Sequence, residues 1–555
     1  MPLASPSPSA TLTAHHVSKS RGLSPILVEI DLVLGPESRV GIIGPNGVGK
    51  TTFLRIVAGL DTPDSGMVAV SPPDATVGYL AQEQEVRSDE TLRGLLARRT
   101  GIAASEAELE SAATALAADS PGAADRYSAA LDRYLGLGGP DAEARTARVL
   151  ADLGLPERLL DVPTAGLSGG QRSRSALAAL LLSRFDVLLL DEPTNDLDFD
   201  GLDRLETFLE QRGGGLVVVS HDRAFLERIV TTVIEIREDT HRASEFGGGW
   251  AAYLEAKATA RRHAEEAYEA YVEDRDRLKS REREQRQWSV QGVAKEKKKP
   301  RDNDKAQRDF RINRTEKQAS KVRITEKALE RLEVVDRPFE PWQLHLDLAS
   351  TRRSGDVVGR LSEAVIERGS FQLGPVDLEL GWADRLALLG PNGSGKTTLL
   401  SALLGRLPLA SGERWLGPSV VVGELGQERK RFSEGTGTLL DAFLVATRST
   451  TSEARALLAK FGLGATHVLR PAASLSPGER TRAELALLMA RGTNCLVLDE
   501  PTNHLDLPAI EQLEQALEAW EGTFVLVTHD RRLLESVRVT VRLELADGKV
   551  SALRI

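Results

Sequence analysis

An internal duplication constrains this chain of 555 residues more than any other feature of its sequence. The run GPNGVGKT at 44–51 returns as GPNGSGKT at 390–397, an offset of 346 residues. LLLDEPTNDLD returns as LVLDEPTNHLD, but there Asp191 and Asp499 are only 308 residues apart. One duplicated module explains both matches if the first copy carries about 37 additional residues between the two motifs. The chain is therefore predicted to contain one fold twice.

Each copy reads as a strand, a glycine-rich loop and a helix, followed by further buried strands. Apolar runs at 39–43 and 385–389 lead into the two glycine loops, and the runs at 187–190 and 495–498 are short, apolar and followed by acids. Such runs are typical of buried parallel strands, so the predicted fold class is α/β. The additional residues of copy one fall near 98–139, where two stretches of helical composition separated by DSPG predict an inserted helical hairpin.

A charged segment separates the copies and predicts the domain division 1–245, 246–340 and 341–555. From 295 to 331 there are 14 Lys or Arg against 7 Asp or Glu, although the whole chain has a net charge of −10. Because 251–286 and 302–337 lack Pro and Gly, they predict two helices joined by the basic loop GVAKEKKKP, with a tip at 288–293. The second helix would pack through one apolar face, formed by Val322, Leu329, Leu332 and Val335.

Composition excludes several classes of protein. The single cysteine, Cys495, cannot form an internal disulfide or complete a thiolate metal site, and it is predicted to be a buried core thiol. No run approaches the ~18 apolar residues of a membrane span. The first residues, MPLASPSPSATL, have neither a basic start nor an apolar core, so they predict a flexible leader rather than a signal peptide. The expected protein is soluble and cytoplasmic, and its positive charge is concentrated in the linker.

The glycine loops predict phosphate binding. In G-x-x-x-x-G-K-[ST], glycines let successive backbone N–H groups turn toward phosphates at a helix N-terminus, and Lys50 or Lys396 neutralises charge. Thr51 and Thr397 are candidate magnesium ligands. An acid at the end of an apolar strand can also hold magnesium, and a carboxylate beside it can position an attacking water. The sequence places these acids as two pairs, Asp191 with Glu192 and Asp499 with Glu500.

Two further residue types recur in order in both copies. Gln82 and Gln427 could bridge metal and water, and His221 and His529 could hydrogen-bond a γ-phosphate. Each residue alone would more often be a solvated glutamine or a loop histidine, but the repeated order favours the site. With LSGGQ at 167–171 and LSPGE at 475–479, both halves resemble ATP-binding cassette domains. Two cassettes without membrane spans, joined by a charged helical linker, resemble the ABC-F family. The linker is most similar to the group that protects ribosomes from antibiotics bound at the peptidyl-transferase centre.

The resemblance implies Mg²⁺-dependent ATP hydrolysis at two composite sites, each closed by the signature sequence of the other copy. Glu192, Glu500, His221 and His529 are then the catalytic candidates. The ATP-binding candidates are Gly44, Asn46, Gly47, Gly49, Lys50, Thr51, Thr52, Gln82, Ser168, Gly169, Gly170, Gln171, Asp191, Gly390, Asn392, Gly393, Gly395, Lys396, Thr397, Thr398, Gln427, Ser476, Gly478, Glu479 and Asp499. Metal ligands among them are Thr51, Gln82, Asp191, Thr397, Gln427 and Asp499, and the RNA-binding candidates are Trp288, Lys295, Lys297, Lys298, Lys299 and Arg301.

Two departures from the family pattern bear on these sites. The second signature has Pro477 and Glu479, and proline has no N–H to donate, so the two sites are expected to hydrolyse ATP unequally. Cassettes commonly stack an aromatic residue on adenine, but the stretch around Ser20 and Arg21 has none. Phe371 is a candidate substitute in copy two.

The favoured function is a monomeric ATPase that enters the transfer-RNA exit site of the ribosome. Its basic linker would neutralise RNA phosphates beside the P-site transfer RNA, and Trp288 would stack on a base, whereas the alternative is a solvated helix face with Trp288 packed inside the hairpin. A housekeeping translation factor remains open. An exporter subunit would need only a short connector, and a DNA-repair ATPase would need structural zinc that one cysteine cannot supply. Neither membrane nor DNA is therefore an expected partner.

Overall fold

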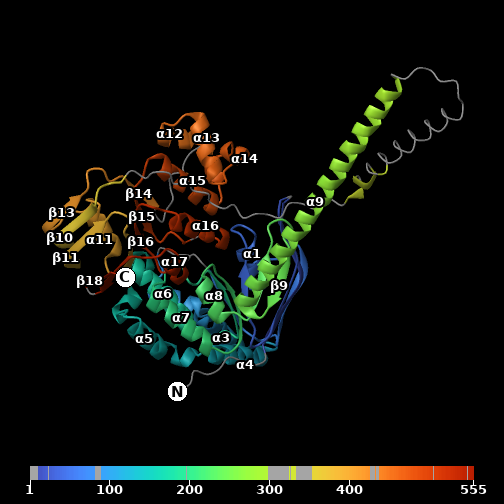
Figure 1. Cartoon of the computed structure of the whole chain (residues 1–555). Helices are drawn as coiled ribbons and strands as arrows, with labels where there is room; N and C mark the ends of the chain where they lie inside the picture. The colour runs from blue at the N-terminus through green and yellow to red at the C-terminus, as the bar shows by residue number, and fades with distance from the viewer. Residues whose placement is uncertain are drawn as a thin grey trace. The chain divides into compact units, whose positions relative to one another are not determined.

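The computed structural model describes residues 10–22, 24–81, 89–195, 197–297, 324, 327–329, 331–332, 353–369, 371–425, 432, 437–503, 505–546 and 548–554. The chain divides into two compact units, one formed by 1–251 together with 342–555 and the other by 252–341. The first unit contains both copies of the duplicated module, coloured blue to green and yellow to red in Figure 1.

Each copy contains an antiparallel sheet of three strands and a larger sheet of six. The orders are β2-β1-β4 and β5-β6-β7-β3-β8-β9 in the first copy, and β11-β10-β13 and β14-β15-β16-β12-β17-β18 in the second. The strands of the first copy are β1 (Thr11–Arg21), β2 (Ser24–Leu34), β3 (Arg39–Ile43), β4 (Ser65–Ser71), β5 (Val77–Leu80), β6 (Val187–Asp191), β7 (Gly215–Val219), β8 (Thr232–Ile236) and β9 (Ala243–Gly247). Those of the second are β10 (Val357–Arg368), β11 (Phe371–Gly381), β12 (Arg385–Leu389), β13 (Ser411–Leu416), β14 (Val422–Leu425), β15 (Cys495–Asp499), β16 (Thr523–Val527), β17 (Val541–Ala546) and β18 (Lys549–Arg554). The matching orders confirm the predicted α/β fold, built twice.

Parallel pairing explains the apolar runs of the sequence. In each large sheet only the last strand pairs antiparallel with its neighbour. Every residue of β6 and β7 is buried, because parallel strands are covered on both faces. On one face, Leu12 of the antiparallel sheet and Phe53 of the helix after the glycine loop share a core with Leu189. The strand before the glycine loop and the helix after it both pack into this core, which holds the loop in place.

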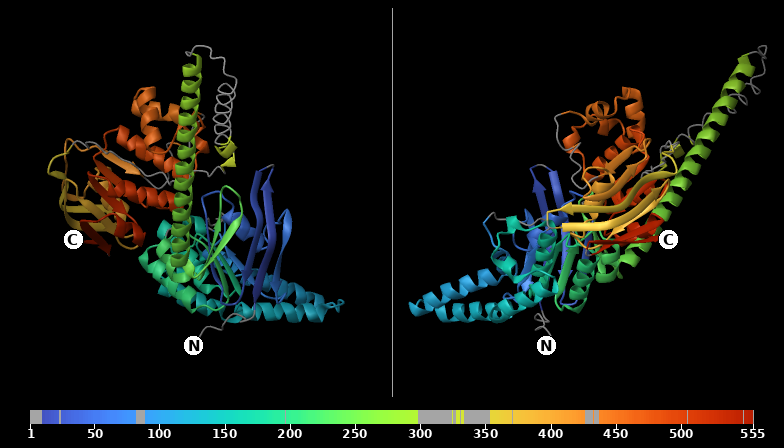
Figure 2. Two further views of the ribbon diagram at one scale, coloured as in Figure 1. Left: turned by 45° about the vertical axis from the view of Figure 1, so that its right-hand side comes forward. Right: turned by 90° about the vertical axis from the view of Figure 1, so that its left-hand side faces the viewer.

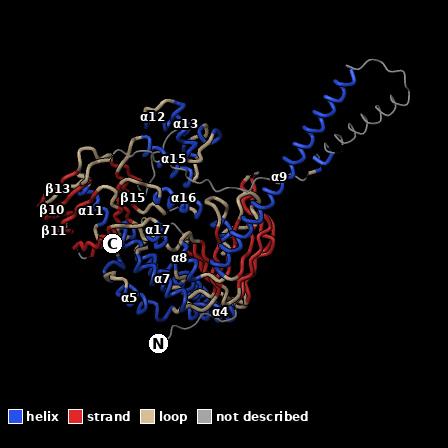
Figure 3. The backbone as a smooth tube through the Cα atoms, viewed as in Figure 1, coloured by secondary structure: helices blue, strands red, loops and turns tan. Residues whose placement is uncertain are grey.

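Helices flank these sheets, and Figure 3 separates them by colour from the strands. The first copy has α1 (Lys50–Val57), α2 (Leu92–Arg99), α3 (Ile102–Ala117), α4 (Ala123–Gly136), α5 (Ala142–Asp152), α6 (Gly169–Leu182), α7 (Phe199–Gln211) and α8 (Arg223–Ile229). The second has α11 (Lys396–Leu403), α12 (Leu439–Thr447), α13 (Thr451–Lys460), α14 (Ala465–Val468), α15 (Pro477–Ala490), α16 (Leu507–Glu518) and α17 (Arg531–Ser536). Short 3-10 helices are η1 (Gly139–Asp141), η2 (Glu157–Asp161), η3 (Thr164–Gly166) and η5 (Ala472–Ser474).

The stretch expected to hold an inserted hairpin contains α3 and α4, which lie side by side in Figure 2 (pale blue). Arg133 on α4 donates to Glu108 on α3 at 2.9 Å, and Arg126 donates to Ser111 at 3.3 Å. Among the described residues of the second copy, the only α-helices between β14 and α15 are α12, α13 and α14. The pair α3 and α4 therefore accounts for the additional residues of copy one.

The linker unit contains one long helix, α9 (Gly249–Lys297). The sequence had predicted that this helix ends near residue 286 and that 288–293 form a loop at the tip, and this prediction is wrong. A glycine inside a helix costs only about 1 kcal/mol relative to alanine, so the single Gly292 does not end the helix and α9 continues past it. Lys295 and Lys297 belong to α9, whereas Lys298, Lys299 and Arg301 lie outside the described residues.

Only fragments of the predicted second linker helix are described. Ile324, residues 327–329 and Arg331 are helical, and Leu332 follows them as a bend. Val322 and Val335 of its predicted apolar face lie outside the described residues. Over the described ranges, no helix combines the length and apolar character needed to cross a membrane.

Candidate nucleotide-binding sites

The glycine loops adopt a conformation that other residues would resist. Gly44, Gly47 and Gly49 have φ values of 149°, 84° and 109°, and their counterparts in copy two have 141°, 85° and 101°. A Cβ on Gly49 would lie 2.6 Å from Cγ2 of Ile26, so the loop also packs too closely for a side chain there. Glycine is required on both grounds. The result is a run of backbone N–H groups that turns at the N-terminus of α1, which is where an anion binds.

The loop lysines close onto their own loops. Lys50 Nζ donates to the carbonyl oxygens of Gly44 and Pro45 at 2.7 and 3.1 Å. Lys396 Nζ donates to its equivalent loop carbonyl at 2.6 Å and contacts Nε2 of His529 at 3.1 Å. Burial lowers the pKa of both lysines, although nearby carboxylates oppose the shift. Each ammonium group therefore lies inside the loop, at the position where a phosphate would bind.

The strand-end acids pair with the threonines predicted to share a metal. Asp191 accepts a hydrogen bond from Thr51 and another from the hydroxyl of Tyr79 at 3.2 Å. In copy two, Oγ1 of Thr397 donates to Oδ2 of Asp499 at 3.4 Å. Burial raises the pKa of both aspartates. A carboxylate beside a hydroxyl is a set of hard oxygen donors, so these residues fit Mg²⁺.

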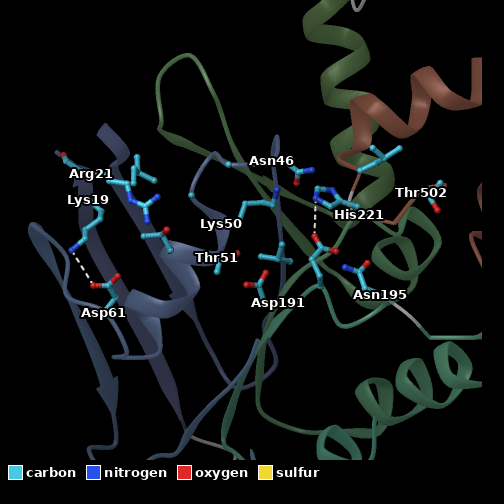
Figure 4. Close-up of a pocket in the computed structure, with 18 residues that line it drawn as sticks. Lys19, Arg21, Asn46, Lys50, Thr51, Asp61, Asp191, Asn195, His221 and Thr502 are labelled. Atoms are coloured by element: carbon cyan, nitrogen blue, oxygen red, sulfur yellow. Dashed lines mark ion pairs between the residues drawn. The ribbon is translucent and has the colours of Figure 1, made fainter. Parts of the chain in front are cut away.

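Glu192 lies beside the first loop with its Oε1 3.2 Å from Nε2 of His221, the residue labelled in Figure 4. Nε2 of His221 thus faces a carboxyl oxygen, whereas its Nδ1 is buried without a hydrogen-bond partner among the described residues. Burial raises the pKa of Glu192 to about 8 and lowers that of His221 to about 3. Buried polar atoms without partners are costly, so this arrangement fits a polar ligand with its own donors and acceptors.

The second copy repeats this pair. Nε2 of His529 lies 3.5 Å from Oε1 of Glu500, and burial lowers the pKa of His529 to about 4. Both histidines are therefore neutral near pH 7 and can accept or donate one hydrogen bond through each nitrogen. Gln82 and Gln427, the predicted bridging glutamines, lie outside the described residues.

The two signatures begin helices through the same capping box. Ser168 accepts from the backbone N–H of Gln171 at 3.3 Å, and the Gln171 side chain accepts from the Ser168 N–H at 2.9 Å. Ser476 and Glu479 form the equivalent bonds at 3.2 and 2.8 Å. Pro477 is the first residue of α15, where the helix does not use an N–H. Glutamate and proline thus preserve the helix start in copy two.

The copies contribute unequally to the two cavities. One cavity gathers Lys396, Thr397 and Glu500 of copy two with Ser168 and Gly170 of copy one, as the composite-site prediction requires. The other cavity gathers the residues of the first loop with Thr502 and Leu505 of copy two (Figure 4). None of Ser476, Gly478 and Glu479 lines it among the described residues. The structure therefore brings most of the second predicted constellation to one cavity, although Gln171 does not line it and Gln427 lies outside the described residues, and it leaves the first cavity without its signature.

Sequence reasoning missed two aspartates at these sites. Asp198 Oδ2 accepts from the N–H of Asn392 at 2.8 Å, and Asp506 Oδ2 accepts from the N–H of Asn46 at 3.1 Å. Each aspartate thus reaches the phosphate loop of the other copy while its Oδ1 caps its own helix, α7 or α16. The available signal was the last acid of DEPTN-x-LD, placed at the N-cap of an apolar helix.

The base end of the first cavity is lined by Lys19, Ser20, Arg21 and Ile26, without an aromatic residue (Figure 4). In copy two, the ring of Phe371 packs close to Gly395, where a Cβ would lie 2.7 Å from Cζ. The ring is therefore next to the second phosphate loop.

Comparisons with known proteins agree with this geometry. The family model described as ABC transporter matches residues 27–195 and 373–503. The tylosin resistance ATP-binding protein TlrC of Streptomyces fradiae is 37% identical over 562 residues, which cover 99% of this chain and 100% of that protein. The energy-dependent translational throttle protein EttA of Mycobacterium tuberculosis is 33% identical over 539 residues, covering 94% and 89%.

Among solved structures, an archaeal ribosome recycling factor in complex with a ribosomal stalk protein is similar with a TM-score of 0.54. The match covers 97% of this chain and 90% of that one, at 18% sequence identity. At this identity the likeness concerns the fold alone, and it agrees with two cassettes in one chain.

Proposed function

Because this chain belongs to the ABC-F family of ATPases with two ATP-binding cassettes, we propose that it acts on the ribosome and protects translation from an antibiotic. One observation carries the proposal: the similarity to the tylosin resistance protein covers 99% of this chain and all of that protein. The similarity therefore includes the linker in addition to the cassettes. The cassettes alone are common to all proteins of this class.

In the proposed action, the protein is a cytoplasmic monomer whose cassettes close on ATP within one chain. It binds the transfer-RNA exit site of the ribosome, and the linker, residues 246–340, extends toward the P-site transfer RNA and the peptidyl-transferase centre. The length and charge of the linker support this role. Its helix α9 has 49 residues, about 70 Å at 1.5 Å per residue, and basic residues are concentrated around and beyond its end. Residues 1–245 and 341–555 would form the two cassettes.

ATP hydrolysis follows from the cassettes, and we propose a role for each group. Loop N–H groups and Lys50 or Lys396 hold the phosphates. Thr51 and Asp191, or Thr397 and Asp499, hold Mg²⁺ with the glutamines, and the bound Mg²⁺ neutralises charge on the phosphates. Glu192 and Glu500 position the attacking water. His221 and His529 donate a hydrogen bond to the γ-phosphate, for which their neutral form is suited.

A second candidate is a translation factor that regulates elongation without any drug. It is favoured by 33% identity to EttA, whose name describes a translational throttle, over 94% of this chain. Both candidates share the ribosome and ATP, and they differ in whether an antibiotic is needed to see the effect.

Cell-free translation with and without tylosin tests the proposal. Purified protein is expected to restore synthesis in tylosin and to leave synthesis unchanged with an inhibitor of the small ribosomal subunit. The Trp288→Ala variant, with unchanged ATPase activity, should restore less. If the wild-type protein restores nothing in tylosin or in other drugs of the peptidyl-transferase centre but alters drug-free synthesis, the translation factor is the better assignment.

A further inference from the structure

Two of the ion pairs that join the cassettes link equivalent positions of the two copies. Arg223 at the start of α8 pairs with Glu514 on α16, where Nη1 and Oε2 are 3.1 Å apart. Arg531 at the start of α17 pairs with Glu206 on α7 at 3.0 Å. The arginines are separated by 308 residues, as are the glutamates, so the duplication makes one contact twice. Such self-complementary pairing is the hallmark of a two-fold interface.

Both pairs are largely withdrawn from water. The side chain of Glu206 is 1% exposed and that of Glu514 is 14% exposed. A buried carboxylate whose partner is removed keeps its desolvation penalty without compensation, so losing either arginine should be costly. An exposed pair between α17 and α8, Arg532 with Glu227, has side chains that are 43% and 47% exposed and offers a contrast within the same interface.

The arginines connect directly to the catalytic candidates. Arg223 follows His221 by two residues, and Asp222 between them caps α8 by accepting from the N–H of Phe225 at 3.0 Å. Glu514 lies on the helix whose cap, Asp506, accepts from the loop N–H of Asn46. Helix α16 thus touches the first site at two points, its phosphate loop and its histidine segment, about 12 Å apart along the helix. Helix α7 touches the second site in the same way through Asp198 and Glu206.

We propose that Arg223 and Arg531 are positioning residues for ATP hydrolysis, each holding the histidine of its own cassette in register with the helix of the other cassette that contacts the same phosphate loop. The inference rests on the proposed roles of the two histidines. With this positioning, ATP hydrolysis at each site depends on where the opposite cassette lies, independently of the signature sequences.

The two Arg–Glu pairs, called clamps below, differ in the other partners of their glutamates. Glu206 also accepts from Arg228 at 2.6 Å, whereas the position equivalent to Arg228 in copy two is Ser536. Among the described residues, Arg223 is the only cation that forms an ion pair with Glu514. Removing Arg223 therefore leaves the partly buried Glu514 without an ion-pair partner among the described residues, whereas removing Arg531 leaves Glu206 with Arg228. The first site should depend more strongly on its clamp.

Site-resolved ATPase assays of the full-length protein test the proposal. Glu500→Gln leaves hydrolysis to the first site and Glu192→Gln leaves it to the second. Arg223→Glu should lower kcat at least about tenfold in the Glu500→Gln background and much less in the Glu192→Gln background, with KM for ATP nearly unchanged. Arg531→Glu should show the reverse preference with a smaller effect. A merely structural role would lower both backgrounds alike.

Exchanging the two charges of one ion pair gives the most direct test. Arg223→Glu with Glu514→Arg should recover most of the activity that either change removes, because the pair is restored with opposite polarity. Arg223→Lys, which keeps the charge but loses the planar fork, should fall between. Arg532→Glu should leave kcat unchanged. Equal loss in both backgrounds, or no recovery in the exchanged double variant, overturns the positioning role. A wild-type protein without ATPase activity would instead overturn the proposed function.

Discussion

At the scale of single residues, Glu192 and Glu500 have backbone conformations that glutamate rarely adopts. Their φ values are 50° and 46°. Each N–H donates to the last carbonyl of the neighbouring strand, from Glu192 to Val219 at 2.8 Å and from Glu500 to Val527 at 2.9 Å. Left-handed residues of this kind cost about 1–3 kcal/mol and persist where the surrounding structure fixes them, often at functional sites. These backbone hydrogen bonds to the neighbouring strands therefore fix the direction in which the two carboxylates point.

Replacing both glutamates by glutamine should separate binding from hydrolysis. The Glu192→Gln, Glu500→Gln variant keeps every phosphate and metal group but loses the water-positioning carboxylates, so ATP turnover should fall at least ~100-fold. Nucleotide affinity, measured by equilibrium dialysis with ATP, should remain near that of the wild type. Normal turnover in the purified double variant would refute the assigned role.

The buried state of Glu192 predicts a pH dependence of stability. Burial raises its pKa from 4.5 in the unfolded chain to about 8 in the nucleotide-free fold. The stability that comes from holding this carboxyl protonated is fully present below pH 4.5 and is lost as pH rises through about 8. Glu192→Gln removes this loss. The difference between the melting temperatures of variant and wild type should grow in favour of the variant from about pH 5 to about pH 8.5. A constant difference would contradict the shifted pKa.

The motif residues could be predicted because their chemistry is local. A glycine loop followed by lysine and threonine, or an apolar run ending in Asp-Glu, encodes its geometry within a few residues. Asp198 and Asp506 escaped because their function depends on the loop of the other copy, and no local pattern encodes that contact. Tyr79 escaped for a similar reason, since its hydroxyl meets Asp191 only through the pairing of β5 with β6.

At the scale of elements, the sequence encodes helix starts more locally than helix ends. Ser168 and Ser476, each followed three residues later by Gln or Glu, encode the starts of α6 and α15 by the capping box itself. The end of α9 was misplaced because Gly292 was given the weight of a turn signal. A lone glycine costs a helix only about 1 kcal/mol, which is too little to end it, and α9 reaches Lys297.

The end of α9 carries a prediction about RNA. Replacing Lys295 and Lys297 with alanine should weaken ribosome binding and reduce the slope of log affinity against log salt by roughly one for each lost phosphate contact. Arg261→Ala with Arg262→Ala removes the same charge from exposed positions nearer the start of α9 and should change the slope less. Co-sedimentation at several salt concentrations measures both, and identical slopes for all three proteins would mean that these lysines face solvent.

At the scale of the whole molecule, the duplication predicted one fold built twice and the place of α3 and α4, because an offset between repeats locates an insertion. It could not predict that the structure places Ser168 with the second phosphate loop but leaves Ser476 outside the first cavity. That difference arises from how two similar modules are placed against each other, which depends on contacts spread over many residues.

The α3 and α4 hairpin should be dispensable for ATP hydrolysis. Gly101 and Leu137 flank it closely, since a Cβ on Gly101 would lie 3.4 Å from Cδ1 of Leu137, so a short Gly-Ser linker can replace residues 102–136. The deletion should leave kcat within about twofold of the wild type, because the second cassette is built without such a hairpin. Loss of nucleotide binding in a folded deletion variant would assign the hairpin a part in the ATP cycle.

Because both cassettes belong to one chain, their association is an intramolecular step. The Arg–Glu clamps hold each module next to its partner at an effective concentration set by covalent connection rather than by the amount of protein in solution. ATP turnover per molecule should therefore be independent of dilution. A cassette that dimerises between separate chains would instead lose specific activity as it is diluted below its dissociation constant. A cell could then keep this protein at very low copy number without losing function.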